Sequence, residues 1–299
     1  MGVRRGSAGY REVGAELVAR RRAAGMTGQQ IADISGWSPA KVSRMERGAT
    51  CTSTADLIHY LVLCKATMPE IRPTLHLARI AERRLGYWLS GRDQGDANSL
   101  RSLIYHEAAA HSTIAYEPLV VPGLLQTPSY ATAQISRETD LPSAHVEAAL
   151  RTRVERQRVL HWARPAGFSF FVHEQALRLE VGGPAVMHEQ LLHLVLVSAL
   201  DHVTLRVVPQ SAGARAAFGG PFMLFEDAKS RPLLYFDLLT SGLFLEDPEY
   251  VEDYRQLLPE LNAVALDEGE SRSFAADLAD AYDRGSPPDA AHLLEKEQL

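Results

Sequence analysis

Cysteine is scarce in this chain of 299 residues. Cys51 and Cys64 are the only two, and they lack the short paired spacing of a zinc ligand set. The 11 histidines are scattered, and no HExxH zinc signature occurs. We therefore expect no metal site and two buried free thiols.

Long apolar runs are also missing. No stretch approaches the roughly 20 consecutive apolar residues that span a bilayer, and residues 1–14 have no apolar signal core after their arginines. The Gly- and Ala-rich stretch 211–221 lacks the Lys-Ser/Thr ending of a phosphate-binding loop. We expect a cytoplasmic protein with no membrane segment and no cofactor.

Basic residues are unevenly distributed. Residues 1–85 hold 14 Lys and Arg against 7 Asp and Glu, whereas the remainder holds 17 against 30. A polyanion is attracted to a basic surface and repelled by an acidic one. Only the N-terminal part is therefore a credible nucleic-acid partner, and the net charge of −6 does not argue against that role.

The length and the 46% hydrophobic content indicate two domains. Apolar periodicity predicts a mainly α, five-helix domain over residues 1–85, followed by a Gly-, Asp- and Asn-rich linker over 86–99. Residues 100–299 are predicted to form an α+β domain with a small antiparallel sheet. A helix is expected over 100–115, and five β-rich runs begin near residues 168, 203, 221, 232 and 242.

Residues 25–48 carry the signals of two short helices. Thr27 is a candidate N-cap with Gln30 three residues on, which predicts a helix over 28–35 that ends at Gly36. Ser38 followed by Pro39 predicts a second helix over 39–46. Four apolar side chains are expected to face inward, namely Ile31, Ile34, Val42 and Met45.

The remaining side chains of the second helix are short, polar or basic, as a surface that contacts the DNA major groove requires. An ordinary helical hairpin would share the capping residues, but not this basic, outward-facing set. The candidate DNA-contacting residues are Gln29, Ser38, Ala40, Lys41, Ser43, Arg44 and Arg47.

This segment resembles the helix-turn-helix of the Xre/Cro family of phage and bacterial repressors. The residues that carry the resemblance are Thr27, Gln30, Ile31, Ala32, Ser43, Arg44 and the ending Glu46-Arg47-Gly48. The resemblance implies a structural ion pair between Arg21 and Glu46. Gly28 and Pro39 depart from the family pattern, because polar residues that contact DNA are usual there. Lys41 and Arg44 are therefore expected to carry most of the direct readout.

The C-terminal part adds five ordered motifs, which begin at Glu117, Ala149, Val181, Val203 and Leu233. With them, residues 11–282 are similar to a large actinobacterial group of Xre-type regulators that have an antitoxin-like C-terminal domain of unknown function. Members are often encoded beside a very small partner protein, and the resemblance implies such a partner here. His173 departs from the family, which more often has aspartate, so it is not expected to be catalytic.

Two motifs in this part allow more than one interpretation. The VPGLLQT segment that begins at Val121 could line a ligand pocket, but we favour the interpretation that it docks a helical hairpin. In the arginine-rich stretch 149–160, the arginines cannot share one helical face, so a single phosphate clamp is not expected. Arg153 and Arg156 are instead expected to meet acidic neighbours inside the fold.

The leading hypothesis is a dimeric regulator of transcription that binds double-stranded DNA, because two recognition helices reach a specificity that one cannot. Its C-terminal domain would sense a small protein or another ligand. One alternative is an enzyme-like, small-molecule-binding domain fused to a DNA anchor. No catalytic set is evident in the sequence, so we expect no enzymatic activity. A ligand-sensing repressor without a protein partner is the other alternative.

Overall fold

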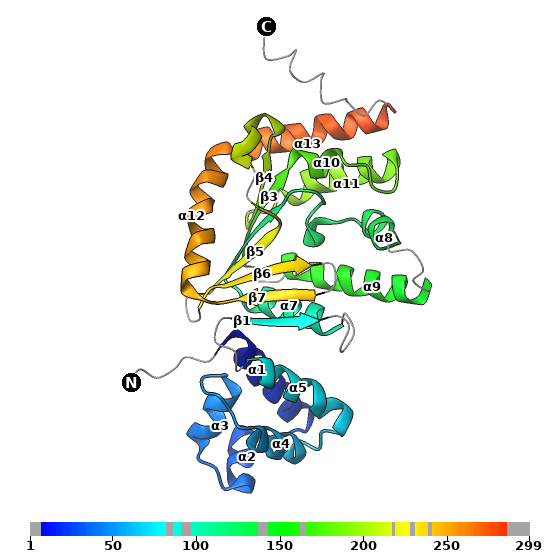
Figure 1. Ribbon diagram of the computed structural model, residues 1–299. Coiled ribbons are helices and arrows are strands. Elements are labelled where there is room, and N and C mark those ends of the chain that lie inside the picture. The colour runs from blue at the N-terminus through cyan, green and yellow to red at the C-terminus, as the bar shows by residue number, and fades with distance from the viewer. Residues whose placement is uncertain are drawn as a thin grey trace. The chain divides into compact units, whose positions relative to one another are not determined.

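The computed structural model describes residues 7–81, 86–90, 97–136, 143–161, 166–216, 219–227, 231–238 and 241–285 (Figure 1). The chain forms two compact units, each made of two segments. The first contains Met1–Tyr105 and Lys229–Glu252, and the second contains His106–Ala228 and Asp253–Leu299. This division does not follow the expected boundary at residue 85.

Five helices form the N-terminal part of the first unit, as the apolar periodicity predicts. They are α1 (Ala8–Ala23), α2 (Gly28–Ser35), α3 (Pro39–Glu46), α4 (Thr54–Leu63) and α5 (Met68–Ala81). Their buried side chains form one apolar cluster around Leu17, Ile31, Val42, Leu57 and Leu61. Burial of this cluster is the main favourable term that holds the short helices together.

Helix α1 approaches the end of α3 very closely, and two glycines make this possible. A Cβ atom on Gly14 would lie 2.4 Å from the carbonyl oxygen of Glu46. Gly48 has a φ of +58°, and a Cβ there would lie 2.2 Å from the carbonyl oxygen of Tyr10. Since both obstacles are backbone atoms, neither position has room for a side chain unless the helices separate.

Three antiparallel strands complete the first unit, and they correct the predicted linker. Strand β1 (Gly86–Ser90) pairs with β7 (Ser241–Leu245), which pairs with β6 (Leu233–Leu238). Helix α7 (Ala97–Ala109) follows β1 in the chain. The Gly- and Asp-rich composition of 86–99 suggested a linker, but the Tyr-Trp-Leu run within it pairs with a strand that lies about 150 residues away in sequence.

A buried carboxylate ties the start of α1 to the residue after β7. Glu246 accepts a 2.8 Å hydrogen bond from the backbone N–H of Ala8 and lies 3.7 Å from Arg11. Burial raises the pKa of the Glu246 carboxyl above its usual value. This contact joins residues that are 238 positions apart.

The second unit contains a mixed sheet, so the prediction of a small antiparallel sheet was wrong. Strand β2 (Ser112–Glu117) pairs antiparallel with β5 (Phe222–Glu226) and parallel with β3 (Gly167–His173), and β3 pairs parallel with β4 (Val203–Val208). Parallel strands need a crossover connection, and helices α10 (Glu174–Arg178) and α11 (Pro184–Val197) occupy the connection from β3 to β4.

Strand β2 also shortens the helix expected over residues 100–115. Helix α7 stops at Ala109, and the chain continues as Ser112–Glu117 in the middle of this sheet, between β3 and β5. The β-branched Thr113 and Ile114 fit a pleated surface better than a helix.

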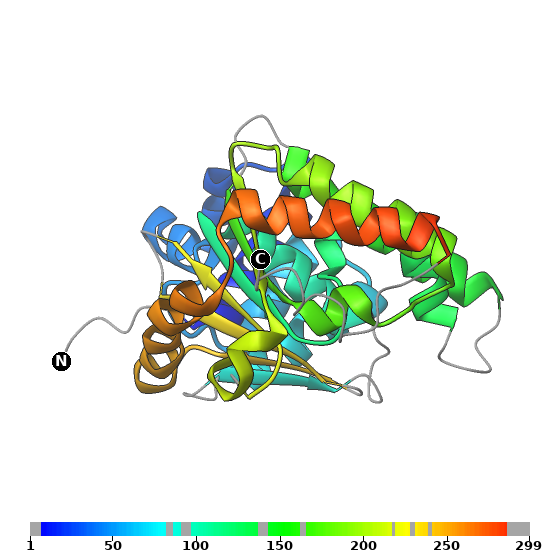
Figure 2. The same cartoon turned by 90° about the horizontal axis from the view of Figure 1, so that it is seen from above.

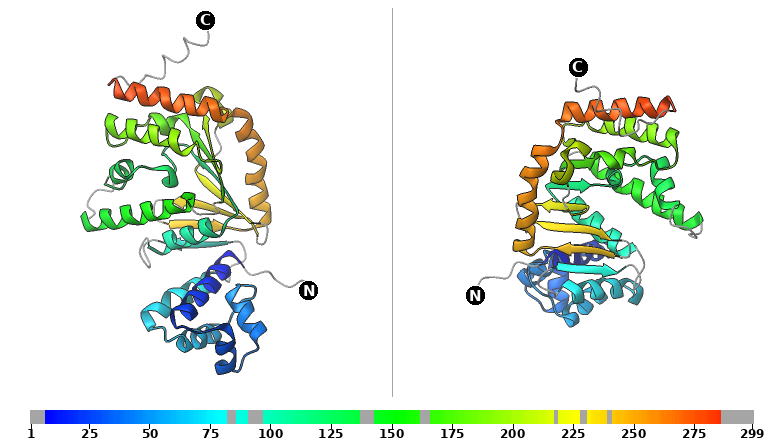
Figure 3. Two further views of the ribbon diagram at one scale, coloured as in Figure 1. Left: turned by 180° about the vertical axis from the view of Figure 1, so that it is seen from behind. Right: turned by 45° about the horizontal axis from the view of Figure 1, so that its top comes forward.

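Helices lie on both sides of these strands. Figures 1 and 3 show α8 (Pro128–Ser136) and α9 (Ser143–Arg156) on one side and α12 (Pro248–Val264) on the other. Helix α13 (Glu268–Asp283) runs alongside α11 (Figure 2). Short 3-10 turns complete the unit at Gly123–Leu125, Gln157–His161 and Gln210–Ala216.

The VPGLLQT segment packs inside the second unit. Leu124 and Leu125 are buried. Arg156 forms a bidentate, buried ion pair with Glu107 at 2.7 and 2.6 Å, and Arg153 donates to the side chain of Gln126 at 2.6 Å. Arg156 thus meets an acidic neighbour as expected, whereas this contact of Arg153 is to an amide. Gln126 belongs to the VPGLLQT segment, so its bond with Arg153 on α9 agrees with the docking interpretation.

Candidate DNA-binding surface

Local hydrogen bonds and one glycine set where α2 and α3 begin and where α2 ends. Thr27 Oγ1 accepts from the N–H of Gln30 at 3.2 Å, and Gln30 Oε1 accepts from the N–H of Thr27 at 2.7 Å. Gly36 ends α2 with a φ of 70°. Ser38 Oγ then accepts from the N–H of Lys41 at 3.2 Å to begin α3. The result is a helix-turn-helix with eight residues in each helix.

The inner face of this motif differs from the expectation at one position. Ile31, Ala32, Val42 and Met45 are buried, but Ile34 is 61% exposed. The buried face of α2 is centred between Ile31 and Ala32. Ile34 lies three positions after Ile31, which places it at the edge of that face and toward solvent. The half-buried Ser35 completes that face instead, and its hydroxyl donates to the carbonyl oxygen of Ile31 at 2.7 Å.

An ion pair fixes the end of α3 against α1. Arg21 Nε and Nη2 donate to the two carboxylate oxygens of Glu46 at 2.7 and 3.0 Å, and Nη1 donates to the carbonyl oxygen of Met26 at 2.9 Å. The Tyr60 hydroxyl donates to Glu46 Oε1 at 2.6 Å. The side chains of Arg21 and Glu46 are only 15% and 13% exposed. Glu46 is therefore held by two other helices.

This ion pair and its buried surroundings change the pKa values of nearby ionisable groups. The hydrogen bonds that Arg21 donates to Glu46 raise the pKa of Arg21, and burial raises the pKa of Tyr60. Burial also raises the pKa of the Cys64 thiol to about 11. Cys64 is buried as expected, but Cys51, in the segment before α4, is exposed, so the expectation of two buried thiols was wrong at Cys51.

Most of the candidate DNA-contacting residues lie on the solvent side of the motif. Arg44 is exposed, and its guanidinium group has no hydrogen-bond or ion-pair partner among the residues that the structure describes. Arg47 Nε donates to the carbonyl oxygen of Ser43 at 3.1 Å, and Gln29 Nε2 donates to Asp33 at 2.7 Å. The exposed members of the set are Gln29, Ser38, Ala40, Ser43, Arg44 and Arg47.

Lys41 is the exception, because its ammonium group is already engaged. Its Nζ lies 2.9 Å from Asp56 Oδ1 and 4.2 Å from the centre of the Trp37 ring. The Trp37 ring in turn meets His59 edge-on, with 5.1 Å between centroids. Sequence reasoning missed Asp56, because a contact between residues 15 positions apart on different helices leaves no spacing signal. It also missed Trp37, although this residue is only four positions before Lys41.

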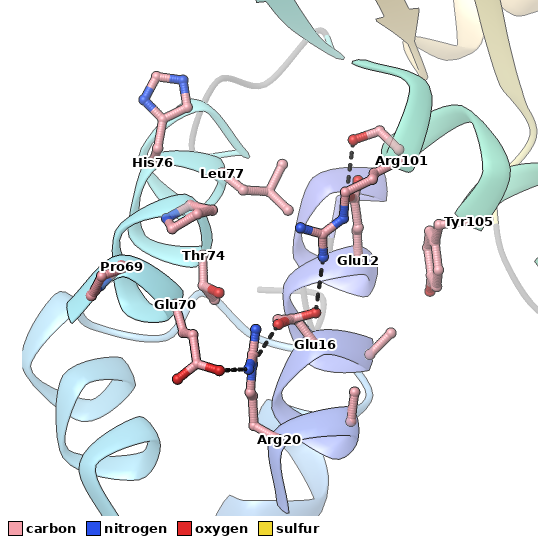
Figure 4. Close-up of a pocket in the computed structure, with 14 residues that line it drawn as sticks. Glu12, Glu16, Arg20, Pro69, Glu70, Thr74, His76, Leu77, Arg101 and Tyr105 are labelled. Atoms are coloured by element: carbon pink, nitrogen blue, oxygen red, sulfur yellow. Dashed lines mark hydrogen bonds and ion pairs between the residues drawn. The ribbon is translucent and has the colours of Figure 1, made fainter. Parts of the chain in front are cut away.

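The first unit also contains a cavity of about 410 Å³ between α1, α5 and the start of α7. A series of ion pairs runs along it (Figure 4). Glu70 pairs with Arg20 at 2.5 Å, Arg20 with Glu16 at 2.8 Å, and Glu16 with Arg101 at 3.4 Å. The apolar part of the lining comes from Ala15, Ala19, Pro69, Pro73 and Leu77.

His173 and Glu174 have structural partners. His173 Nδ1 accepts from the N–H of Gln175 at 3.0 Å, which makes His173 the N-cap of α10. The buried Glu174 pairs with Arg178 at 2.6 Å and accepts from the N–H of Gln210 at 2.8 Å. Within the described ranges, no group of three or more His, Cys, Asp or Glu residues is arranged to hold a metal ion, and no helix is long and apolar enough to cross a membrane.

These features define a helix-turn-helix protein, and residues 12–74 match a family described as helix-turn-helix domain. That match extends from α1 into α5. The chain belongs to the family described as domain of unknown function (DUF5753), which matches residues 100–277, more than half of its length. No curated protein and no solved structure matches the chain.

Substitution of Glu46→Ala should destabilise the helix-turn-helix domain by about 3 kcal/mol, because it leaves a largely buried guanidinium without its carboxylate. Urea unfolding followed by circular dichroism measures this. Glu70→Ala, which removes a more exposed carboxylate from Arg20, is the matched control and should cost far less. Equal losses for the two variants would contradict a structural role for the Arg21–Glu46 pair.

Proposed function

We propose that this protein is a sequence-specific, DNA-binding regulator of transcription. The single observation that carries the proposal is the solvent face of α3. An exposed Arg44 without an internal partner lies there on a capped helix whose far end is fixed by the Arg21–Glu46 pair. An arginine on a rigid helix can donate two hydrogen bonds to one guanine in the major groove. The excess of basic residues in 1–85 supports the same proposal.

The proposed regulator is of the Xre type, works as a homodimer and acts in the cytoplasm. The likeness of α2 and α3 to Xre/Cro repressors and of the C-terminal motifs to actinobacterial regulators supports the assignment. A recognition helix of eight residues reaches only a few base pairs. Two such helices on a symmetric dimer bind two half-sites about one turn of DNA apart and gain the specificity that one helix lacks.

The DUF5753 domain is proposed to carry the regulatory input. A small partner protein or a ligand that binds one conformation better than another would shift the protein between states with high and low DNA affinity. The antitoxin-like resemblance supports the protein partner. The cavity beside α1 supports the alternative that the domain binds a ligand. Arg101 and Ser102 line this cavity, and they are among the first residues of the DUF5753 match.

The Arg44→Ala variant should lose roughly 1–3 kcal/mol of binding free energy for its target duplex, and its base preference should relax at one position of the site. Gel-shift titration against single-base variants of the duplex measures both effects. Arg79→Ala removes the same charge from an exposed position on α5 and is the control. Unchanged affinity in Arg44→Ala would show that α3 is not the recognition helix.

Purification of the tagged full chain from its native host should recover one very small protein in at least one growth phase. Mass spectrometry of the eluate identifies it, with an unrelated tagged protein as the control. If no small protein is recovered in any growth phase, the partner version is excluded. A thermal-shift screen of metabolites then tests the ligand version.

A further inference from the structure

We propose that Asp56 is a positioning residue that sets DNA specificity by holding Lys41 in place on the DNA-binding surface. This inference rests on the proposed function. It adds a residue of α4, outside the helix-turn-helix, to the groups that determine which DNA is bound.

The backbone of Asp56 is fixed at the start of a helix. It lies in the first turn of α4, where its N–H donates to the N-cap oxygen of Ser53 at 3.1 Å. A negative charge at this place also interacts favourably with the positive end of the helix dipole. The backbone that carries this side chain is thus fixed, and the carboxylate lies 2.9 Å from the Lys41 ammonium.

Trp37 provides a second, independent contact to the same ammonium group. This residue lies in the turn between α2 and α3, and part of its side chain packs against the apolar core of the five helices. Its ring faces Lys41 Nζ at 4.2 Å, a distance typical of a cation–π contact. A lysine side chain has four rotatable bonds, and two contacts from different elements remove much of that freedom.

The side chains of Lys41 and Asp56 remain 34% and 32% exposed, so the held ammonium still reaches solvent. Lys41 lies three residues before the exposed Arg44 and shares its side of α3. An ammonium group has three N–H donors, and the ion pair with Asp56 occupies only one side of it. Donors therefore remain for a base edge, at a position that the protein has fixed beforehand.

The carboxylate has a second effect on binding. A free lysine near DNA pairs with any phosphate, and such contacts raise affinity for every sequence alike. Asp56 partly neutralises Lys41 and also repels phosphate groups. It thereby weakens the sequence-independent part of binding while it keeps the Lys41 donors directed to one place.

The test compares the full-length wild type with Asp56→Asn, Asp56→Glu, Lys41→Ala and the double variant Asp56→Asn with Lys41→Ala. Each is titrated at several salt concentrations with two duplexes of equal length. One is the duplex that the wild type enriches most from a random pool, and the other is its scrambled sequence. Thermal unfolding of each variant reports any loss of folding.

Asp56→Asn should raise affinity for the scrambled duplex about two- to fivefold, the range expected for a partly exposed ion pair. The ratio of the two affinities should fall, and the slope of log affinity against log salt should steepen by about one for the scrambled duplex. Asp56→Glu should restore much of the ratio. In the Lys41→Ala background, Asp56→Asn should leave the ratio unchanged.

Three results would overturn the inference. The first is an unchanged affinity ratio in Asp56→Asn. The second is an equal change in the affinity ratio when Asp56→Asn is made in the wild type and in the Lys41→Ala background. Asp56 would then act only through its own charge and not through Lys41. The third is a uniform loss for both duplexes that follows a lower melting temperature. If the wild type itself enriches no duplex, the proposed function fails, and the inference fails with it.

Discussion

The interaction on which the candidate DNA-binding surface depends is the ion pair between Arg21 and Glu46. An isolated helix of eight residues is unstable in water, so α3 needs external contacts to hold its direction. Glu46 supplies them, because it joins the end of α3 to Arg21 of α1 and to Tyr60 of α4. Gly14 and Gly48 allow the close approach that this pair requires. The direction of the exposed residues on α3 follows from these contacts.

The helix-turn-helix could be predicted from the sequence because its signals are local. Thr27 with Gln30, Gly36, and Ser38 with Pro39 lie within three residues of the groups that they cap or break. The limits of this reasoning appear at Ile34 and Lys41. Whether the Ile34 side chain is buried depends on which residues lie at the centre of the buried face of the short helix α2. The state of Lys41 depends on Asp56, which only the packing of α4 against the motif brings near.

In the second half of the chain too, features that depend on neighbouring residues could be predicted, and features that depend on distant residues could not. Several strands were predicted from their β-rich composition, including those at Phe168 and Val203. The parallel pairing of these strands was not predicted, because strand pairing depends on contacts between segments that lie far apart in sequence. The placement of β1, β6 and β7 in the first unit has the same origin, as does the bond from Ala8 to Glu246.

Selection from a random pool of duplexes by the purified full chain shows whether the protein recognises a DNA sequence. A sequence-specific dimer should enrich one motif with two symmetric halves, whose centres are about 10 base pairs apart. Uniform recovery of the pool, with no motif enriched over many rounds, would contradict the proposed function.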